Sequence, residues 1–204
     1  MSVSKSLPRL RKARGEAWEQ VKTLQRIYEK HQLWHRSPYD GAFMFLTSEG
    51  WLTTATRIKK NNVKPKDLSL VLSFDEKKNE ITYVGNRVPS SDLPEFLILV
   101  NRNEKELAKR GEKLPVIKYV VHFHKNEITR DTRFKKYAIP FYRYGMFESG
   151  HNFADEILKK NKATPGVNIS GKGRGFIILE HGVVRMGVKL DHLEKFLESF
   201  DLIN

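Results

Sequence analysis

Residues 115–124 read PVIKYVVHFH, an apolar run that ends in two histidines separated by one residue. The length of the run and its β-branched residues predict a strand. Side chains at positions i and i+2 of a strand point to the same face, so we expect His122 and His124 to emerge together while Phe123 points into the opposite layer. Two imidazoles placed in this way can bind one metal ion.

A third histidine follows a second apolar segment. Residues 175–188 read GFIILEHGVVRMGV, which predicts a strand, a turn and a strand, with His181 in the turn directly before Gly182. A catalytic zinc ion usually has three protein ligands and keeps a fourth position for water or substrate. We therefore predict a site for Zn²⁺, or another divalent metal, formed by His122, His124 and His181.

The absence of cysteine limits the ligands that such a site can use. None of the 204 residues is cysteine, which excludes disulfides, thiolate ligands and a cysteine nucleophile. His-x-His alone is a weak signal, so structural or exposed histidines stay open as the alternative. We assign a structural or exposed role to the other four histidines, which are His31, His35, His151 and His192.

Length and composition favour one compact domain. The chain has 204 residues, of which 39% are hydrophobic, enough to bury a sizeable core. No apolar run approaches the roughly 18 residues that span a bilayer, and the first residues lack the apolar segment of a secretory signal. We expect a soluble, cytoplasmic protein that does not bind membranes.

The net charge of +13 favours anionic partners, which include nucleic acid, acidic membrane surfaces and phosphorylated metabolites. Charge alone does not choose among them. The Lys and Arg residues are interleaved with acidic residues, as in NRNEKELAKRGEK at 101–113, which is typical of a solvated helix face. We therefore do not expect nucleic acid as a partner, although a nucleic-acid binder remains an alternative.

Hydrophobic periodicity gives the order of elements. It predicts a long helix over 7–33, then two hairpins, and a helix that begins after Ser91 or Asp92. The strand that ends at His124 follows, then a short strand, a helix, the strand–turn–strand around His181 and a final amphipathic helix. This order fits an α/β fold with an antiparallel or mixed sheet and helices laid against it.

Four short motifs occur in an order known from one family. They are Pro89-Ser90-Ser91-Asp92, VVHFH at 120–124, ESGHNFADEILKK at 148–160 and FIILEHGVVRMGVKLDHLEKF at 176–196. In their order and spacing these motifs resemble the class II aldolase/adducin family, from about residue 41 to residue 200. We expect one such domain over residues 1–204, with an N-terminal helix in 1–36 and the family-like core in 41–200.

The resemblance implies a central, mostly antiparallel sheet flanked by helices on both sides, as a three-layer sandwich, and commonly a homotetramer. It implies a zinc-dependent lyase of aldolase type that acts on a sugar or sugar phosphate through a metal-stabilised enediolate. In that reading His122, His124 and His181 are the zinc ligands. Asp92 stands where the family has its catalytic Glu and acts as general acid/base. Tyr144 is a candidate proton donor.

The chain departs from the family in the segments that bind phosphate. The family's Gly-Asn-Ile-Ser would fall at residues 41–44, where the Asn and Ser are missing, and its Ser-Gly element would fall at residues 54–56, which are also altered. Ser90 and Ser91 remain as candidate phosphate ligands. We expect Arg57, Lys59 or Lys60, which follow the altered residues 54–56, to supply positive charge in place of the lost backbone pocket.

Two alternatives lie within the same resemblance. An adducin-like protein would keep the fold and work as a non-catalytic binding or scaffolding module. An epimerase or dehydratase would use the same metal-stabilised intermediate but would break a different bond from the carbon–carbon bond that an aldolase breaks. The shorter Asp at position 92, in place of Glu, is compatible with a changed reaction or with lost catalysis.

Overall fold

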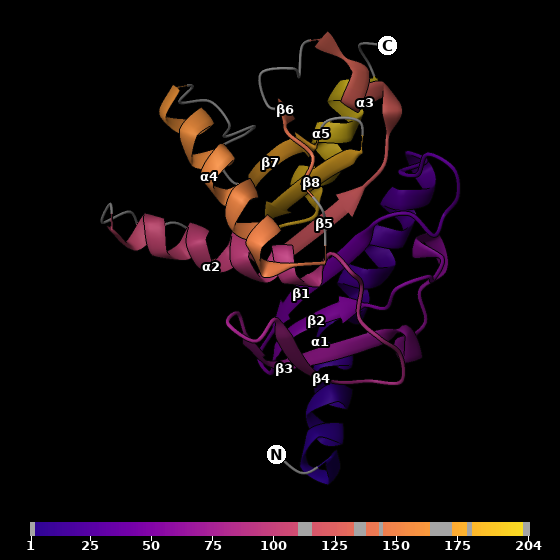
Figure 1. Ribbon diagram of the computed structural model, residues 1–204. Helices are drawn as coiled ribbons and strands as arrows, with labels where there is room; N and C mark the ends of the chain where they lie inside the picture. The colour runs from indigo at the N-terminus through magenta and orange to yellow at the C-terminus, as the bar shows by residue number, and fades with distance from the viewer. Residues whose placement is uncertain are drawn as a thin grey trace.

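The computed structural model describes residues 3–109, 116–132, 138–142, 145–163, 173–178 and 181–201. In these ranges a sheet lies between two layers of helices (Figure 1). The helices are α1 (Val3–Lys30), α2 (Leu93–Lys109), α3 (Asn126–Arg130), α4 (Phe147–Ala163) and α5 (Asp191–Asp201). The strands are β1 (Ala42–Thr47), β2 (Gly50–Thr54), β3 (Leu68–Asp75), β4 (Glu80–Val84), β5 (Tyr119–Phe123), β6 (Ala138–Ile139), β7 (Gly173–Ile178) and β8 (Gly182–Gly187).

The sheet has eight strands in the order β4-β3-β2-β1-β5-β8-β7-β6. Neighbouring strands are antiparallel, except β6 and β7, which pair in parallel at one edge. Both predicted hairpins are present as β1–β2 and β3–β4. The prediction of a mostly antiparallel sheet is therefore confirmed, and β5 lies inside it between β1 and β8.

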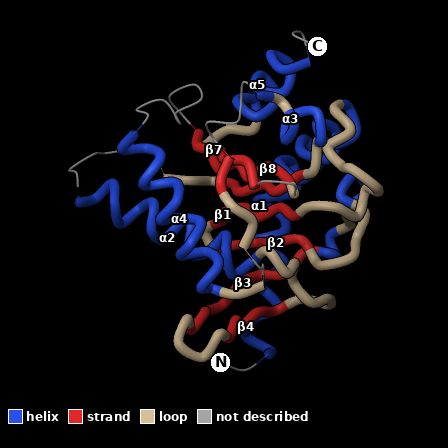
Figure 2. Tube along the Cα trace, turned by 45° about the horizontal axis from the view of Figure 1, so that its top comes forward, coloured by secondary structure: helices blue, strands red, loops and turns tan. Residues whose placement is uncertain are grey.

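Helices cover both faces of the sheet. Helices α2 and α4 lie on one face, whereas α1 and α5 lie on the other (Figures 1 and 2). Strand β5 divides its side chains between the two layers, because Val120 packs in the α2/α4 cluster while Val121 and Phe123 pack in the α1/α5 cluster. The predicted three-layer arrangement is thus confirmed.

Helix α1 packs against the sheet along one apolar stripe. The apolar residues that recur at helical spacing are all buried in the core, namely Leu10, Ala13, Ala17, Val21, Leu24 and Tyr28. In the described part of the chain, no helix combines the length and the apolarity needed to cross a membrane.

Three basic residues near the start of α1 contact residues of the sheet and its first turn. Arg9 Nε lies 2.9 Å from a carboxylate oxygen of Glu49, and Lys12 Nζ lies 2.8 Å from the other. Arg14 donates a hydrogen bond to the backbone oxygen of Leu68 at 2.7 Å. These three cations therefore anchor α1 to the β1–β2 turn and to β3.

Candidate metal centre

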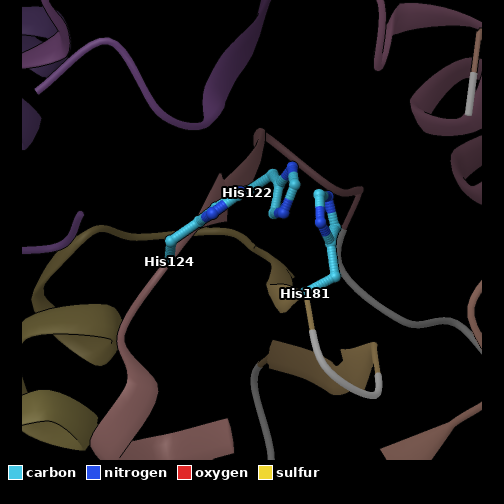
Figure 3. Close-up of side chains that lie close together, drawn as sticks. All are labelled: His122, His124 and His181. Atoms are coloured by element: carbon cyan, nitrogen blue, oxygen red, sulfur yellow. The ribbon is translucent and has the colours of Figure 1, made fainter. Parts of the chain in front are cut away.

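Three histidines from two segments of the chain lie together at the ends of two neighbouring interior strands of the sheet. His122 is in β5 and His124 directly follows that strand, whereas His181 directly precedes β8. Because β5 and β8 are antiparallel neighbours, the end of the first meets the start of the second. The three imidazoles point toward one another (Figure 3), with ring centroids 4.7 to 5.0 Å apart.

The donor atoms of this histidine triad fit one metal ion. One ring nitrogen from each residue lies within 4.8 Å of the others. His122 Nε2 is buried and has no hydrogen-bond partner among the described residues. A buried nitrogen without a partner is costly, and a metal ion would satisfy it. The residues present therefore suit a divalent cation that accepts imidazole nitrogen.

Asp92 orients one ring of the triad. It stands directly before α2, and its Oδ2 accepts a hydrogen bond from His122 Nδ1 at 2.9 Å. This contact leaves His122 Nε2 with a lone pair that faces the other two rings. Burial opposes ionisation of Asp92, but the interaction with His122, including its hydrogen bond, outweighs that effect and holds the pKa of Asp92 below its ordinary value.

The other two histidines are held neutral. Burial, followed by the neighbouring His122, lowers the pKa of His124 to about 3 and that of His181 to about 4. Neutral imidazole is the form that binds a metal. Both side chains are therefore ready as ligands at neutral pH without losing a proton first.

Two glycines allow the chain to pass close to His122. Gly182 lies so close to β5 that a Cβ there would come 2.6 Å from His122 Nε2. Gly41 has φ +89°, and a Cβ there would collide with the backbone oxygen of His122. Glycine is thus required after His181 because a side chain there would collide with the His122 ring, as well as because of the turn.

A cavity of about 290 Å³ opens beside the triad. Ser90, Ser91, Arg57, Asp92 and the three histidines all line it, and we call it the serine cavity. Lys59 is not among its described lining residues. Its ammonium group lies 5.9 Å from the centre of the Tyr39 ring.

Lys60 lines the serine cavity in place of Lys59. Its ammonium group donates to the backbone oxygens of Ile58 at 3.0 Å and Tyr39 at 3.3 Å. Burial lowers the pKa of Lys60 to about 8, although the nearby Asp92 opposes this. Its charge is therefore held within the wall of the cavity.

Glu95 is a site residue that the sequence analysis missed. It lies one helical turn after Asp92 in α2, is only 3% exposed, and lines a cavity of about 20 Å³ with Asp92, His122 and His181. Gly145 N–H donates to its Oε1 at 2.6 Å, while Oε2 has no hydrogen-bond partner in the described ranges. Burial raises the pKa of Glu95 to about 8, so the carboxyl group is protonated at neutral pH.

Asp40 is a second residue that the sequence analysis missed. Its Oδ2 accepts backbone N–H groups of His35, Arg36 and Ser37 at 3.1 to 3.4 Å, in the turn after α1. Asp40 lines the serine cavity and also a larger one, of about 510 Å³, which we call the arginine cavity because Arg36 and Arg130 line it. Its Ser-Pro-Tyr-Asp-Gly context indicates only a turn, so its place near the triad depends on the fold.

None of the other histidines belongs to the triad, and one candidate cannot be placed. Tyr144, the candidate proton donor, lies outside the described residues. His151 Nε2 lies 2.9 Å from Glu76, and His35 Nδ1 lies 2.5 Å from the side-chain nitrogen of Asn126. His31 is buried and His192 is partly buried in α5. Among the described residues, the only group of three or more potential metal ligands close enough to share an ion is the triad.

Comparison with solved structures places this fold in one class. YgbL from Escherichia coli, described as a candidate aldolase/epimerase/decarboxylase, aligns over 91% of this chain and 88% of its own, with a TM-score of 0.60 and 19% identity. An L-fuculose 1-phosphate aldolase aligns over 92% of this chain and 82% of its own, with a TM-score of 0.61 and 16% identity.

A third similar structure is the L-fuculose-1-phosphate aldolase from Thermus thermophilus. It aligns over 93% of this chain and 88% of its own, with a TM-score of 0.55 and 16% identity. No protein-family model matches the sequence, and no curated protein matches it. The chain has a class II aldolase-like fold, in agreement with the resemblance that the sequence motifs carry.

Proposed function

We propose that this protein is a zinc-dependent lyase of aldolase type that acts on a sugar or sugar phosphate. The observation that carries the proposal is the histidine triad, with one nitrogen from each ring within 4.8 Å of the others in a class II aldolase-like fold. A divalent ion held there would act as a Lewis acid toward substrate oxygens. The neighbouring L-fuculose-1-phosphate aldolases support a sugar-type substrate.

The roles of the protein side chains follow from their places. Asp92 Oδ2 orients His122, and we assign its Oδ1 to exchange a proton with the substrate. Ser90, Ser91 and Arg57 line the serine cavity, where hydroxyl and guanidinium donors suit a phosphate group. Lys59 and Tyr144 keep the roles that the sequence proposes, as a source of charge and as a proton donor.

Metal analysis followed by a substrate panel tests the proposal. Protein purified without added metal is expected to contain about one equivalent of zinc or another divalent metal. It is expected to cleave at least one phosphorylated ketose, with loss of activity in chelator and recovery on adding metal. His151→Ala serves as a matched control, because this exposed histidine pairs with Glu76 away from the triad. A metal-free, inactive protein that stays folded would contradict the proposal.

The same panel separates the alternatives within this fold. Epimerisation or dehydration of a substrate without carbon–carbon cleavage would replace the lyase assignment while keeping the metal site. Metal binding without turnover of any sugar would favour an adducin-like binding module.

We further propose one domain per chain, a cytoplasmic location and a homotetramer. The tetramer predicts a mass near four times 23.8 kDa by light scattering.

A further inference from the structure

The arginine cavity lies next to the triad and contains cations that the proposed reaction does not use. It has a volume of about 510 Å³, and all of its described lining residues are polar or charged. Arg36 comes from the turn after α1, and Arg130 is the last residue of α3. These two positions are far apart in sequence, so the fold brings two guanidinium groups to one hollow.

Both guanidinium groups are available for a ligand. Both residues are exposed, and neither has an ion-pair partner within the described ranges. Two other arginines near the sheet behave differently, since Arg9 pairs with Glu49 and Arg87 lies 3.1 Å from a carboxylate oxygen of Asp67. Guanidinium groups bind carboxylate and phosphate through paired hydrogen bonds, so an anionic ligand group matches this cavity.

The two cavities meet at the triad. His124, His181 and Asp40 line both the arginine cavity and the serine cavity. The carboxylate of Asp40 is the acidic group at this junction, and backbone N–H groups already satisfy one of its oxygens. A ligand whose middle contacts the triad therefore has a set of cationic and polar donors at each end.

We propose that the substrate carries an anionic group at both ends, a phosphate in the serine cavity and a carboxylate in the arginine cavity bound by Arg36 and Arg130. This inference rests on the proposed function and narrows its substrate class to phosphorylated sugar acids. The hydroxyl-bearing carbons between the two ends would lie against the triad. Neither Arg36 nor Arg130 contacts the reacting atoms in this arrangement, so both set specificity.

A matched pair of ligands isolates the carboxylate. The probes are 6-phosphogluconate and sorbitol 6-phosphate, which differ only in a carboxylate in place of a hydroxymethyl group. Isothermal titration calorimetry on the zinc-loaded protein is expected to show that 6-phosphogluconate binds at least about tenfold more tightly than sorbitol 6-phosphate. A hydrogen bond between charged groups lowers the dissociation constant by about that factor. The double variant Arg36→Ala/Arg130→Ala is expected to lose most of that advantage and to bind sorbitol 6-phosphate as before.

Arg26→Ala is the control, because Arg26 is an exposed arginine of α1 that lines neither cavity. Its preference for 6-phosphogluconate is expected to equal that of the parent protein. An unchanged preference in the double variant would overturn the inference, since the carboxylate would then be bound elsewhere. Equal binding of both probes to the zinc-loaded parent protein, or binding of neither, would overturn the inference alone. Failure of the protein to take up zinc at all would overturn the proposed function as well.

Discussion

Asp92 controls the histidine triad through a single hydrogen bond. A ring nitrogen can face a metal only if the other ring nitrogen carries the proton, and the Asp92 carboxylate fixes that arrangement in His122. The same residue stands at the position of the proposed acid/base. Asp92 therefore has two proposed roles, which are to orient the His122 ring and to exchange a proton with the substrate. Variants at this position can remove one role and keep the other.

The variant Asp92→Asn is expected to weaken metal affinity by about 10- to 100-fold, since such carboxylate partners contribute about that much. Competition with a chromogenic chelator measures this change. Asp92→Glu, which introduces the family's residue, is expected to retain more affinity than the amide. If Asp92→Asn binds metal and turns over substrate like the parent protein, both roles assigned to Asp92 are wrong.

Gly182→Ala is expected to disturb the triad, because its Cβ would come 2.6 Å from His122 Nε2. The ring must move, so we expect lower metal content together with a loss of about 1 to 3 kcal/mol in the free energy of unfolding. Gly15→Ala in α1 is the matched control. No described neighbour lies within 4 Å of a Cβ there, and alanine in a helix is expected to stabilise the protein by up to about 1 kcal/mol.

Helix α2 carries two carboxyl groups to the site in successive turns. Asp92 precedes the helix and is ionised, whereas Glu95 lies in its first turn and is protonated. His122 donates a hydrogen bond to Asp92, whereas Glu95 is buried next to the negative charge of Asp92. Glu95 also accepts the backbone N–H of Gly145, just before α4, so it links the two helices that cover one face of the sheet.

The raised pKa of Glu95 makes stability depend on pH. In the unfolded chain its pKa is near 4.5 and in the folded protein it is about 8, so the folded state holds a proton that the unfolded state loses. Stability from this group is complete below about pH 4.5 and is lost as the pH rises toward 8. Glu95→Gln is expected to remove this loss, of about 2 to 4 kcal/mol, while keeping an acceptor for Gly145.

Urea unfolding at pH 5, 6, 7 and 8 measures the effect. Glu104→Gln, an exposed position of the same helix, is the control and is expected to follow the parent protein. Parallel pH profiles for the parent protein and Glu95→Gln would show that Glu95 is ionised in the folded state.

The sequence predicted most elements, and the misses have physical reasons. Hairpins β1–β2 and β3–β4 follow from local alternation and turn residues, as does the α1 stripe. Helix α3 was not predicted, because its five residues are mostly polar and only Ile128 is fully buried. The parallel pairing of β6 was not predicted either, since its two residues carry no signal for a partner strand.

At the scale of the whole molecule, the metal is expected to stabilise the folded chain. A ligand that binds only the folded state adds about 2.7 kcal/mol at a hundred times its dissociation constant. For a protein of this size that amounts to a rise of about 5 to 10 °C in melting temperature. His124→Ala is expected to abolish the rise and His151→Ala to retain it, as measured by calorimetry with and without zinc. An equal rise in both variants would place the bound zinc outside the triad.

The candidate site was only partly predictable, because burial depends on the whole molecule. His122, His124 and His181 follow from strand periodicity and from a resemblance in motif order, and the fold brings them together. The protonation of Glu95 and the places of Asp40, Arg36 and Arg130 depend on which distant segments surround them. No local pattern in the sequence contains that information.

The triad joins residues at the end of β5 to a residue at the start of β8, which affects the local stability of this strand pair. Phe123 and Val183 form the last residue pair of β5 and β8, at the end where the three rings lie. An ion bound by the rings would therefore hold this end of the two strands together. Fraying of that end would then require release of the ion. Amide hydrogen exchange near this residue pair is therefore expected to slow when metal is bound, while the far pair, Tyr119 with Gly187, keeps its own rate.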